Sequence, residues 1–346
     1  LACSILGTIQ TLLLPVNSTM LGLPLHRSDP YSIGGPVSTF LKSQQSGNID
    51  TLDNEINALN VMRTQAVSVA GEPFDSSALL RYNFHLTSLA PRFASYENDM
   101  KFQFSYADPF KPQQRVVCSN IYFEWGCVLW NLAAIESLRG TRADRSSDEG
   151  IRNACKFFQQ ACGILDLLKE KILPLLKGVK VTSALTEDGV TMAKHLVFAQ
   201  AQACFYEKSC LDKKAGTMKA AIVGKLAQQA SVYFNQAYNY TKTVQMSAVL
   251  DSSWGAYGHF QTQAFAGAAE FWTAMGSKEN ALQKGTGFGE EVVRLTRAEG
   301  YYTQAVTSAK MTNTSAAIYG PVESILRTTS KSKASAVKDN ANVYME

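Results

Sequence analysis

The sequence is poor in charged residues, and its charge is almost balanced. Charged residues make up 18% of the 346 residues, against about a quarter in typical globular domains, which excludes long acidic or basic tails. The 33 Lys and Arg exceed the 29 Asp and Glu by only four, and a net charge of +4 gives no argument for nucleic-acid binding. Apolar residues reach 46%, so we expect an ordered globular protein with room for one large domain or two modest ones.

The chain also lacks the residue patterns of common metal and disulfide sites. Its seven cysteines are odd in number and form no CxxC pair, which favours a reduced, intracellular compartment over a disulfide framework. Cys155 and Cys162 share one helical face but lie about 10 Å apart along the helix axis, too far to bridge, so we expect both in the core. None of the four histidines has a metal-binding spacing such as HExxH, and we expect no cofactor or metal: His26, His85, His195 and His259.

Motifs of enzymes are missing as well. The sequence has no GxSxG nucleophile elbow and no Walker loop. The glycine cluster KGTGFGEE (284–291) is followed by two acidic residues that would repel a phosphate, so it predicts a helix N-terminus instead, with Glu290 and Glu291 complementing the helix dipole. An enzyme is therefore the least favoured class of function.

The chain begins with an apolar stretch of uncertain origin. Residues 1–16 lack a basic region and fall short of the roughly 20 residues that span a bilayer, so they predict neither a signal peptide nor a membrane anchor. The first methionine is Met20. We therefore treat residues 1–20 as an N-terminal extension and expect a single domain over 21–346.

Hydrophobic periodicity predicts a mostly α-helical chain with a small N-terminal sheet. A short helix is expected from about Pro36 and two further helices from Ile49 and from the cap at Asp75, whereas KFQFSY (101–106) alternates at period 2 like a strand. After Ser119 we expect about six long helices, separated by four breaks: 139–150, 177–189, 208–216 and 276–289. Alanine-rich faces at 199–203 and 266–270 would let helices approach closely, as in antiparallel helix pairs of the tetratricopeptide kind, although no strict 34-residue period appears.

The helix expected over 217–240 carries more apolar surface than one contact requires. One stripe would face the domain core: Val223, Ala227, Ala230, Phe234 and Ala237. Ile222 and Leu226, spaced i, i+4, lie outside this stripe. They are covered either by another helix of the same domain or by the amphipathic helix of a partner protein that docks in an exposed groove.

Ordered blocks of the sequence resemble the Bro domain (Bro-one domain) family, from about Leu21 to Glu346. The blocks are ALLRYNFHLTSLAPRF (78–93), FQFSYADPF (102–110), FEWGCVLWNLAAIES (123–137), SDEGIRNACKFFQQACGIL (147–165), FAQAQACFYEKS (198–209), MKAAIVGKLAQQASVYF (218–234), FGEEVVRL (288–295) and AVKDNANVYME (336–346). The resemblance implies a curved, mostly helical domain with a tetratricopeptide-like core of helix pairs and a small N-terminal β-sheet.

The resemblance also implies a partner and a site. In ALIX-like members a concave apolar patch receives the C-terminal amphipathic helix of an ESCRT-III subunit of the charged multivesicular body protein class. By motif, that patch falls on Phe205, Ile222 and Leu226, with Lys208 and Asp148 as polar neighbours that would orient the partner. The family's tyrosine of phosphorylation-dependent binding matches Tyr344, which could equally be a packed side chain.

The predicted function is accordingly that of a non-enzymatic adaptor in endosomal sorting and multivesicular body formation, cytoplasmic and recruited to endosomes. Two alternatives stay open. One is a membrane-associating module whose convex basic surface contacts anionic lipid, and the other is a Bro domain within a rhophilin-like signalling scaffold. The segment 111–122 is shorter than its counterpart in ALIX-like members, so the resemblance does not extend to lipid insertion there.

Overall fold

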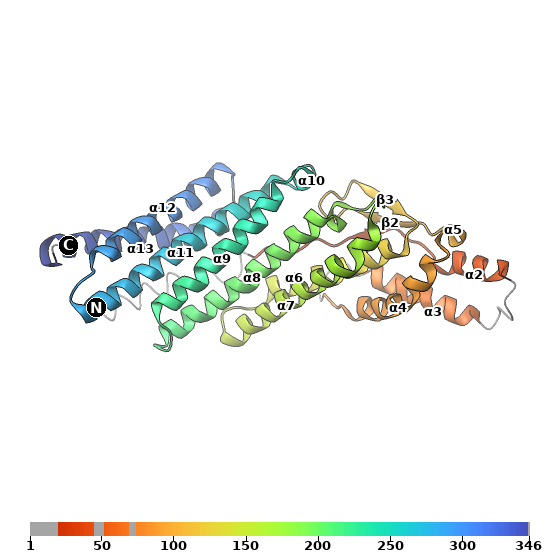
Figure 1. Ribbon diagram of the computed structural model, residues 1–346, viewed down its shortest axis with the longest axis horizontal. Helices are drawn as coiled ribbons and strands as arrows, with labels where there is room; N and C mark the ends of the chain where they lie inside the picture. The colour runs from red at the N-terminus through yellow and green to blue at the C-terminus, as the bar shows by residue number, and fades with distance from the viewer. Residues whose placement is uncertain (1–19, 45–51, 69–73, 345–346) are drawn as a thin grey trace.

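The computed structural model describes residues 20–44, 52–68 and 74–344, and these form an elongated stack of helices with a small sheet near one end (Figure 1). The α-helices are α2 (Gly34–Ser43), α3 (Asp53–Val67), α4 (Ser77–Ala94), α5 (Glu97–Met100), α6 (Ile121–Arg142), α7 (Asp148–Leu167), α8 (Glu187–Lys214), α9 (Ala220–Thr241), α10 (Val244–Ser247), α11 (Ser252–Lys284), α12 (Gly289–Met311) and α13 (Ala316–Asp339). Four short π or 3₁₀ turns accompany them: η2 (Leu168–Ile172), η3 (Leu173–Leu176), η4 (Ser183–Leu185) and η5 (Asn340–Tyr344). Two predictions fall outside the described part of the chain: the N-terminal extension, in its residues 1–19, and the start of the second helix, at 49–51.

The sheet has three antiparallel strands in the order β1 (Arg27–Ser28), β2 (Phe104–Ala107) and β3 (Arg115–Cys118). The predicted strand at 101–106 is therefore real but begins three residues later. Its alternation has the expected cause, because Phe104 and Tyr106 are both fully buried. The other two strands were missed, since two and four residues are too short to show a period.

The long helices pack in chain order, each antiparallel helix against the next, from α6 to α13, with the short α10 set aside. Small residues allow the close approach. A Cβ at Gly224 of α9 would lie 2.9 Å from Oγ1 of Thr273 on α11, and one at Gly267 would lie 2.8 Å from the Tyr302 ring on α12. This arrangement of helix pairs confirms the predicted tetratricopeptide-like fold class.

The predicted breaks between helices were partly wrong. The described chain after residue 119 holds seven long helices instead of six, because the break at 312–315 contains neither Gly nor Pro and was missed. Two helices also run further than predicted, α8 to Lys214 and α11 to Lys284. The charged residues interpreted as loop are exposed or half-buried helix positions, and α11 ends where Gly285 adopts a left-handed φ of 78°.

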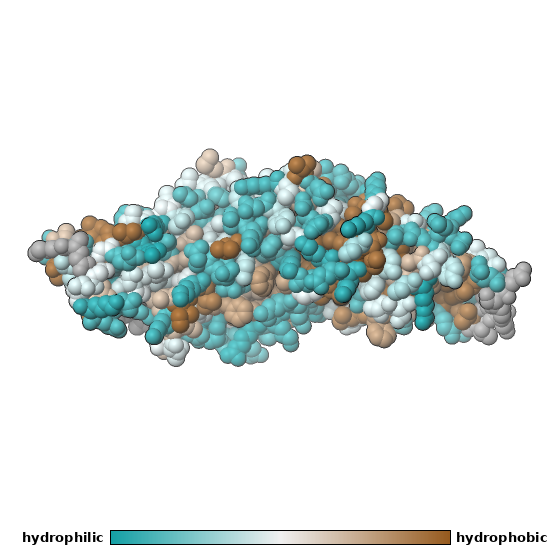
Figure 2. Space-filling model, viewed as in Figure 1, coloured by the Kyte–Doolittle hydropathy of each residue, from teal (hydrophilic) through white to brown (hydrophobic). Residues whose placement is uncertain are grey.

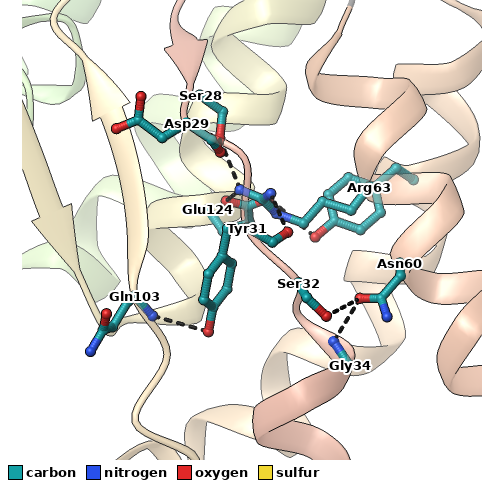
Figure 3. A network of polar contacts seen from close by, with 10 residues as sticks. Ser28, Asp29, Tyr31, Ser32, Gly34, Asn60, Arg63, Gln103 and Glu124 are labelled. Atoms are coloured by element: carbon teal, nitrogen blue, oxygen red, sulfur yellow. Dashed lines mark hydrogen bonds and ion pairs between the residues drawn. The ribbon is translucent and has the colours of Figure 1, made fainter.

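An ion pair buried between α3 and α6 fixes the N-terminal segment to the helical stack (Figure 3). Arg63 donates from Nε to Glu124 at 2.8 Å, from Nη1 to the Tyr31 carbonyl at 3.0 Å and from Nη2 to the Ser28 hydroxyl at 3.0 Å. Tyr82 donates a further hydrogen bond to Glu124 at 3.2 Å. The network satisfies a buried charge that the sequence alone gave no reason to pair.

Several predictions about the core are confirmed. The five stripe residues of α9 are all buried, and α12 begins at Gly289 with Glu290 and Glu291 in its first turn. Cys155 and Cys162 are buried and free, and burial raises the pKa of each thiol to about 11, so neither is a thiolate at neutral pH.

Candidate protein-binding surface

An apolar surface lies where the C-terminal half of α8 runs beside the N-terminal half of α9. The two helices are antiparallel neighbours joined by a short loop, and Nε2 of Gln202 donates a hydrogen bond to the carbonyl of Leu226 at 3.2 Å across the seam between them. Figure 2 shows several brown groups on a mostly hydrophilic face, some of them over α8 and α9. We call the side chains of Phe205, Ile222 and Leu226 the α8–α9 patch.

The members of the patch are open to solvent to different degrees. Phe205 and Ile222 are 46% and 44% exposed, and Leu226 is half-buried against the core. The sequence left open whether another helix of the domain covers Ile222 and Leu226. Within the described residues Ile222 is left open to solvent, whereas Leu226 is partly covered by the core of the same domain.

Two aromatic side chains extend the apolar surface along the same seam. The rings of Phe198 on α8 and Tyr233 on α9 have centroids 4.6 Å apart, and Phe198 is also exposed. Both were missed as site residues. The signal was present, because each lies seven residues, or two helical turns, from a member of the patch.

The structure brings Lys208 and Asp148 together at the edge of the patch. Nζ of Lys208 lies 2.9 Å from Oδ1 of Asp148 at the start of α7, and it also pairs with Asp212 one turn further along α8. Hydrogen bonds from Lys208 lower the pKa of Asp148, and those to Asp212 and Asp148 raise the pKa of Lys208. Arg152 is a second cationic partner of Asp148. The edge therefore holds fixed charges whose side chains are already oriented.

A second, buried ion pair connects the α6–α7 turn to α8 next to this edge. Arg145, in the turn between α6 and α7, donates from Nε to Glu207 of α8 at 3.1 Å. Burial raises the pKa of Glu207 to about 7, against the opposing effect of Arg145. The pair ties the α6–α7 turn to the helix that carries Phe205 and Lys208.

Tyr344 does not join this surface. It belongs to η5, and its ring stacks on Phe288 at the start of α12 with centroids 3.4 Å apart. In the packing order of the stack, α11 separates α12 from α9. Tyr344 is a half-exposed side chain at another place on the molecule.

The part of the chain that the structure describes has no group of three or more His, Cys, Asp or Glu residues that could hold a metal ion. Among its helices, none has the length and apolar character needed to cross a membrane. An apolar cavity of about 630 Å³ lies away from the patch, between α2, α3 and α4, and is lined by residues such as Phe40, Ile56 and Leu89.

Stacked antiparallel helices with an uncovered apolar seam define a helical-repeat scaffold. The chain belongs to the BRO1-like domain family, whose family model matches residues 20–346. This confirms the resemblance seen in the sequence blocks.

Curated relatives cover the same region of this chain. The chain is 25% identical over 327 residues to ALG-2 interacting protein X of Dictyostelium discoideum. The alignment covers 94% of this chain and 40% of that protein. The chain is also 26% identical over 330 residues to pH-response regulator protein palA/RIM20 of Emericella nidulans, with 95% of this chain and 37% of the relative covered. The chain thus spans about two fifths of the length of these relatives.

Solved structures agree on the fold. The ALIX BRO1 CHMP4C complex matches with a TM-score of 0.81 and 26% identity, covering 95% of this chain and 90% of the other. A structure described as the basis for endosomal targeting by the Bro1 domain also has a TM-score of 0.81, over 96% of this chain and 88% of the other, at 17% identity. The second likeness concerns the fold alone.

Proposed function

We propose that this protein is a non-enzymatic adaptor whose α8–α9 patch binds the C-terminal amphipathic helix of an ESCRT-III subunit of the charged multivesicular body protein class. It would act in endosomal sorting and multivesicular body formation, as a cytoplasmic protein recruited to endosomes through that contact. One observation carries the proposal: Phe205 and Ile222, on adjacent helices of a BRO1-like fold, are exposed beside a fixed Lys208–Asp148 pair.

The geometry suits a helix better than an extended peptide. The open seam between α8 and α9 offers a long apolar strip, whereas strand addition needs an exposed sheet edge. An amphipathic helix presents apolar side chains at i, i+3, i+4 and i+7, which can lie along such a strip. The charged side chains at its edge would then fix the direction of the bound helix.

The expected affinity is modest. Full burial of a large apolar side chain is worth about 1.5–3 kcal/mol, and because Phe205 and Ile222 are already about half-buried, a partner gains roughly 1 kcal/mol from each. Phe198 and Tyr233 add area along the same strip. A micromolar Kd requires about 8 kcal/mol net of the cost of association, so these apolar contacts alone predict binding weaker than micromolar.

Isothermal titration of the full chain with the partner's C-terminal peptide tests the proposal. Ile222→Asp places a carboxylate in the apolar contact, so we expect affinity to fall about tenfold or more while the thermal transition stays unchanged. Val337→Asp on α13 is the matched control, since Val337 is 46% exposed on another helix. Equal affinity of the Ile222→Asp variant and the unmodified chain would overturn the proposed site.

A further inference from the structure

The segment between α7 and α8 combines exposed apolar side chains with unpaired lysines. Leu175 is 47% exposed in η3, and its neighbour Pro174 is exposed as well. Leu167, at the end of α7, is 43% exposed. In the same connection Leu168 and Leu176 are buried, and Leu173 is half-buried.

Positive charge surrounds the exposed Pro174 and Leu175. We call residues 171–181 the α7–α8 tip. Residues 171–185 contain three lysines and no acidic residue. Lys171, Lys177 and Lys180 are exposed, and none forms an ion pair with a residue that the structure describes. Lys169, by contrast, is bound to Thr191 and Glu187, so it belongs to the α7–α8 contact and not to the tip.

The tip is held rigidly at both ends. Ile172 before Leu175 and Leu176 after it are both buried. Beyond Leu176, Gly178 turns the chain at a φ of 79°, and Thr182 Oγ1 lies 2.8 Å from Nε2 of His26. A protruding apolar residue that is already ordered loses little conformational entropy when it binds.

We infer that residues 171–181 form a contact site for an anionic membrane surface, with Leu175 entering the interface and the three lysines lying over acidic headgroups. Binding of this kind combines buried apolar area with electrostatic attraction to anionic lipid. The three lysines favour an anionic surface, and the exposed Pro174 and Leu175 beside them favour a bilayer, which can take up apolar side chains, over an acidic peptide. A single inserted leucine and three lysines make the contact weak and strongly salt-dependent.

The site is separate from the α8–α9 patch. Phe205 lies 18 residues beyond the start of α8 at Glu187, about 27 Å along the helix axis. A membrane at the tip and a partner helix on the patch would therefore occupy different parts of the molecule, and each can be tested without the other.

Vesicle flotation of the full chain tests the inference, with phosphatidylcholine vesicles that contain either no phosphatidylserine or about 30% of it. We expect binding only to the anionic vesicles, lost at high salt. The double variant Lys177→Glu with Lys180→Glu should lower the partition coefficient at least about tenfold, and Leu175→Ser should lower it severalfold. The matched controls are Lys331→Glu with Lys338→Glu on α13, and Leu282→Ser at the end of α11, all exposed positions at the other end of the stack (Figure 1).

Each outcome is decisive for the site. Loss in the tip variants with retention in the controls supports it, provided that circular dichroism shows the same thermal transition for all variants. Equal loss in the control variants would show a general charge effect and overturn it, as would vesicle binding that the tip variants leave unchanged. Absence of vesicle binding, together with binding of a polyglutamate peptide that Lys177→Glu with Lys180→Glu abolishes, would assign the tip to an acidic peptide instead. Retained binding of the ESCRT-III peptide by the tip variants separates this result from the proposed function.

Discussion

Lys208 on α8 lies with its ammonium nitrogen 2.9 Å from a carboxylate oxygen of Asp148 on α7, at the edge of an uncovered apolar seam. The pair links two neighbouring helices of the stack and sets a fixed charge pattern beside Phe205. It is partly exposed, so its contribution to folding is small. We therefore propose that the pair orients the partner and raises the rate of association.

Replacement of Lys208 should change binding more than stability. Lys208→Met removes the cation between Asp148 and Asp212, and we expect the ESCRT-III peptide to bind about three- to tenfold more weakly, mainly through slower association and with less salt dependence. Stopped-flow binding at two salt concentrations measures this. Lys213→Met, which removes a lysine paired with Glu279 on α11, is the control and should leave the association rate unchanged. Identical rates for both variants would contradict the orienting role.

The buried pair of Arg63 and Glu124 should matter greatly for folding. Glu124→Gln leaves the guanidinium of Arg63 buried with no counter-charge, so we expect the free energy of unfolding to fall by about 3–5 kcal/mol. Urea denaturation measures the change. Glu323→Gln, which breaks pairs with Lys310 and Arg327 at the surface of α13, should cost less than about 1 kcal/mol. A similar small cost at both positions would show that the buried network is dispensable.

His26 predicts a loss of stability in acid. Burial lowers its pKa from 6.5 to about 3, so the unfolded chain binds a proton more readily than the folded one. The stabilising contribution of neutral His26 is complete above pH 6.5 and declines as the pH falls towards 3. Between pH 7.5 and 5.5 the loss should be about 1.4 kcal/mol.

The His26→Gln variant isolates this effect. It should be less stable than the unmodified chain at pH 7.5, because the hydrogen bond with Thr182 and the ring contacts with Tyr106 and Trp130 change. The difference between the two proteins should shrink by about the same 1.4 kcal/mol at pH 5.5. Chemical denaturation at both values measures it, and a difference independent of pH would mean that His26 titrates normally in the fold.

Tyr344 is proposed as a phosphorylation site, and its stack on Phe288 should restrain the reaction. A kinase must draw the tyrosine ring away from Phe288, on which it stacks almost parallel. We expect Phe288→Ala to raise the rate of phosphorylation of Tyr344 by a purified tyrosine kinase severalfold. Tyr301 on α12 is the internal control, since both tyrosines are 36% exposed. Mass spectrometry resolves the two sites, and an unchanged rate at Tyr344 would rule out restraint by the stack.

The parts of this protein that the sequence predicts are those with a local signal. The core stripe of α9 has a 3.6-residue period, and the same pattern shows that Ile222 and Leu226 lie outside the stripe, where Ile222 is exposed and Leu226 is half-buried. Identification of Phe205 as their neighbour needed the family resemblance, because no local rule relates positions on two different helices.

The parts that the sequence did not predict depend on contacts between distant residues. Arg63 and Glu124 are 61 residues apart, and their pairing arises only when α3 packs on α4 and α4 packs on α6. The same holds for Arg145 and Glu207, and for the strands β1 and β3, which are too short to be stable without their neighbour β2. The break between α12 and α13 was missed although its signal is local, since Asn313 adopts a left-handed φ of 53° and Ser315 caps α13.

The packing of the long helices in chain order has a mechanical consequence. In such a linear array each helix is held chiefly by its two neighbours. The effect of unfolding one helix on the others therefore decreases with distance along the stack. Tension applied to the protein at α13 would peel away that helix and then α12 while α8 and α9 stayed assembled. The α8–α9 patch would therefore keep its shape under forces that already detach α13 and α12.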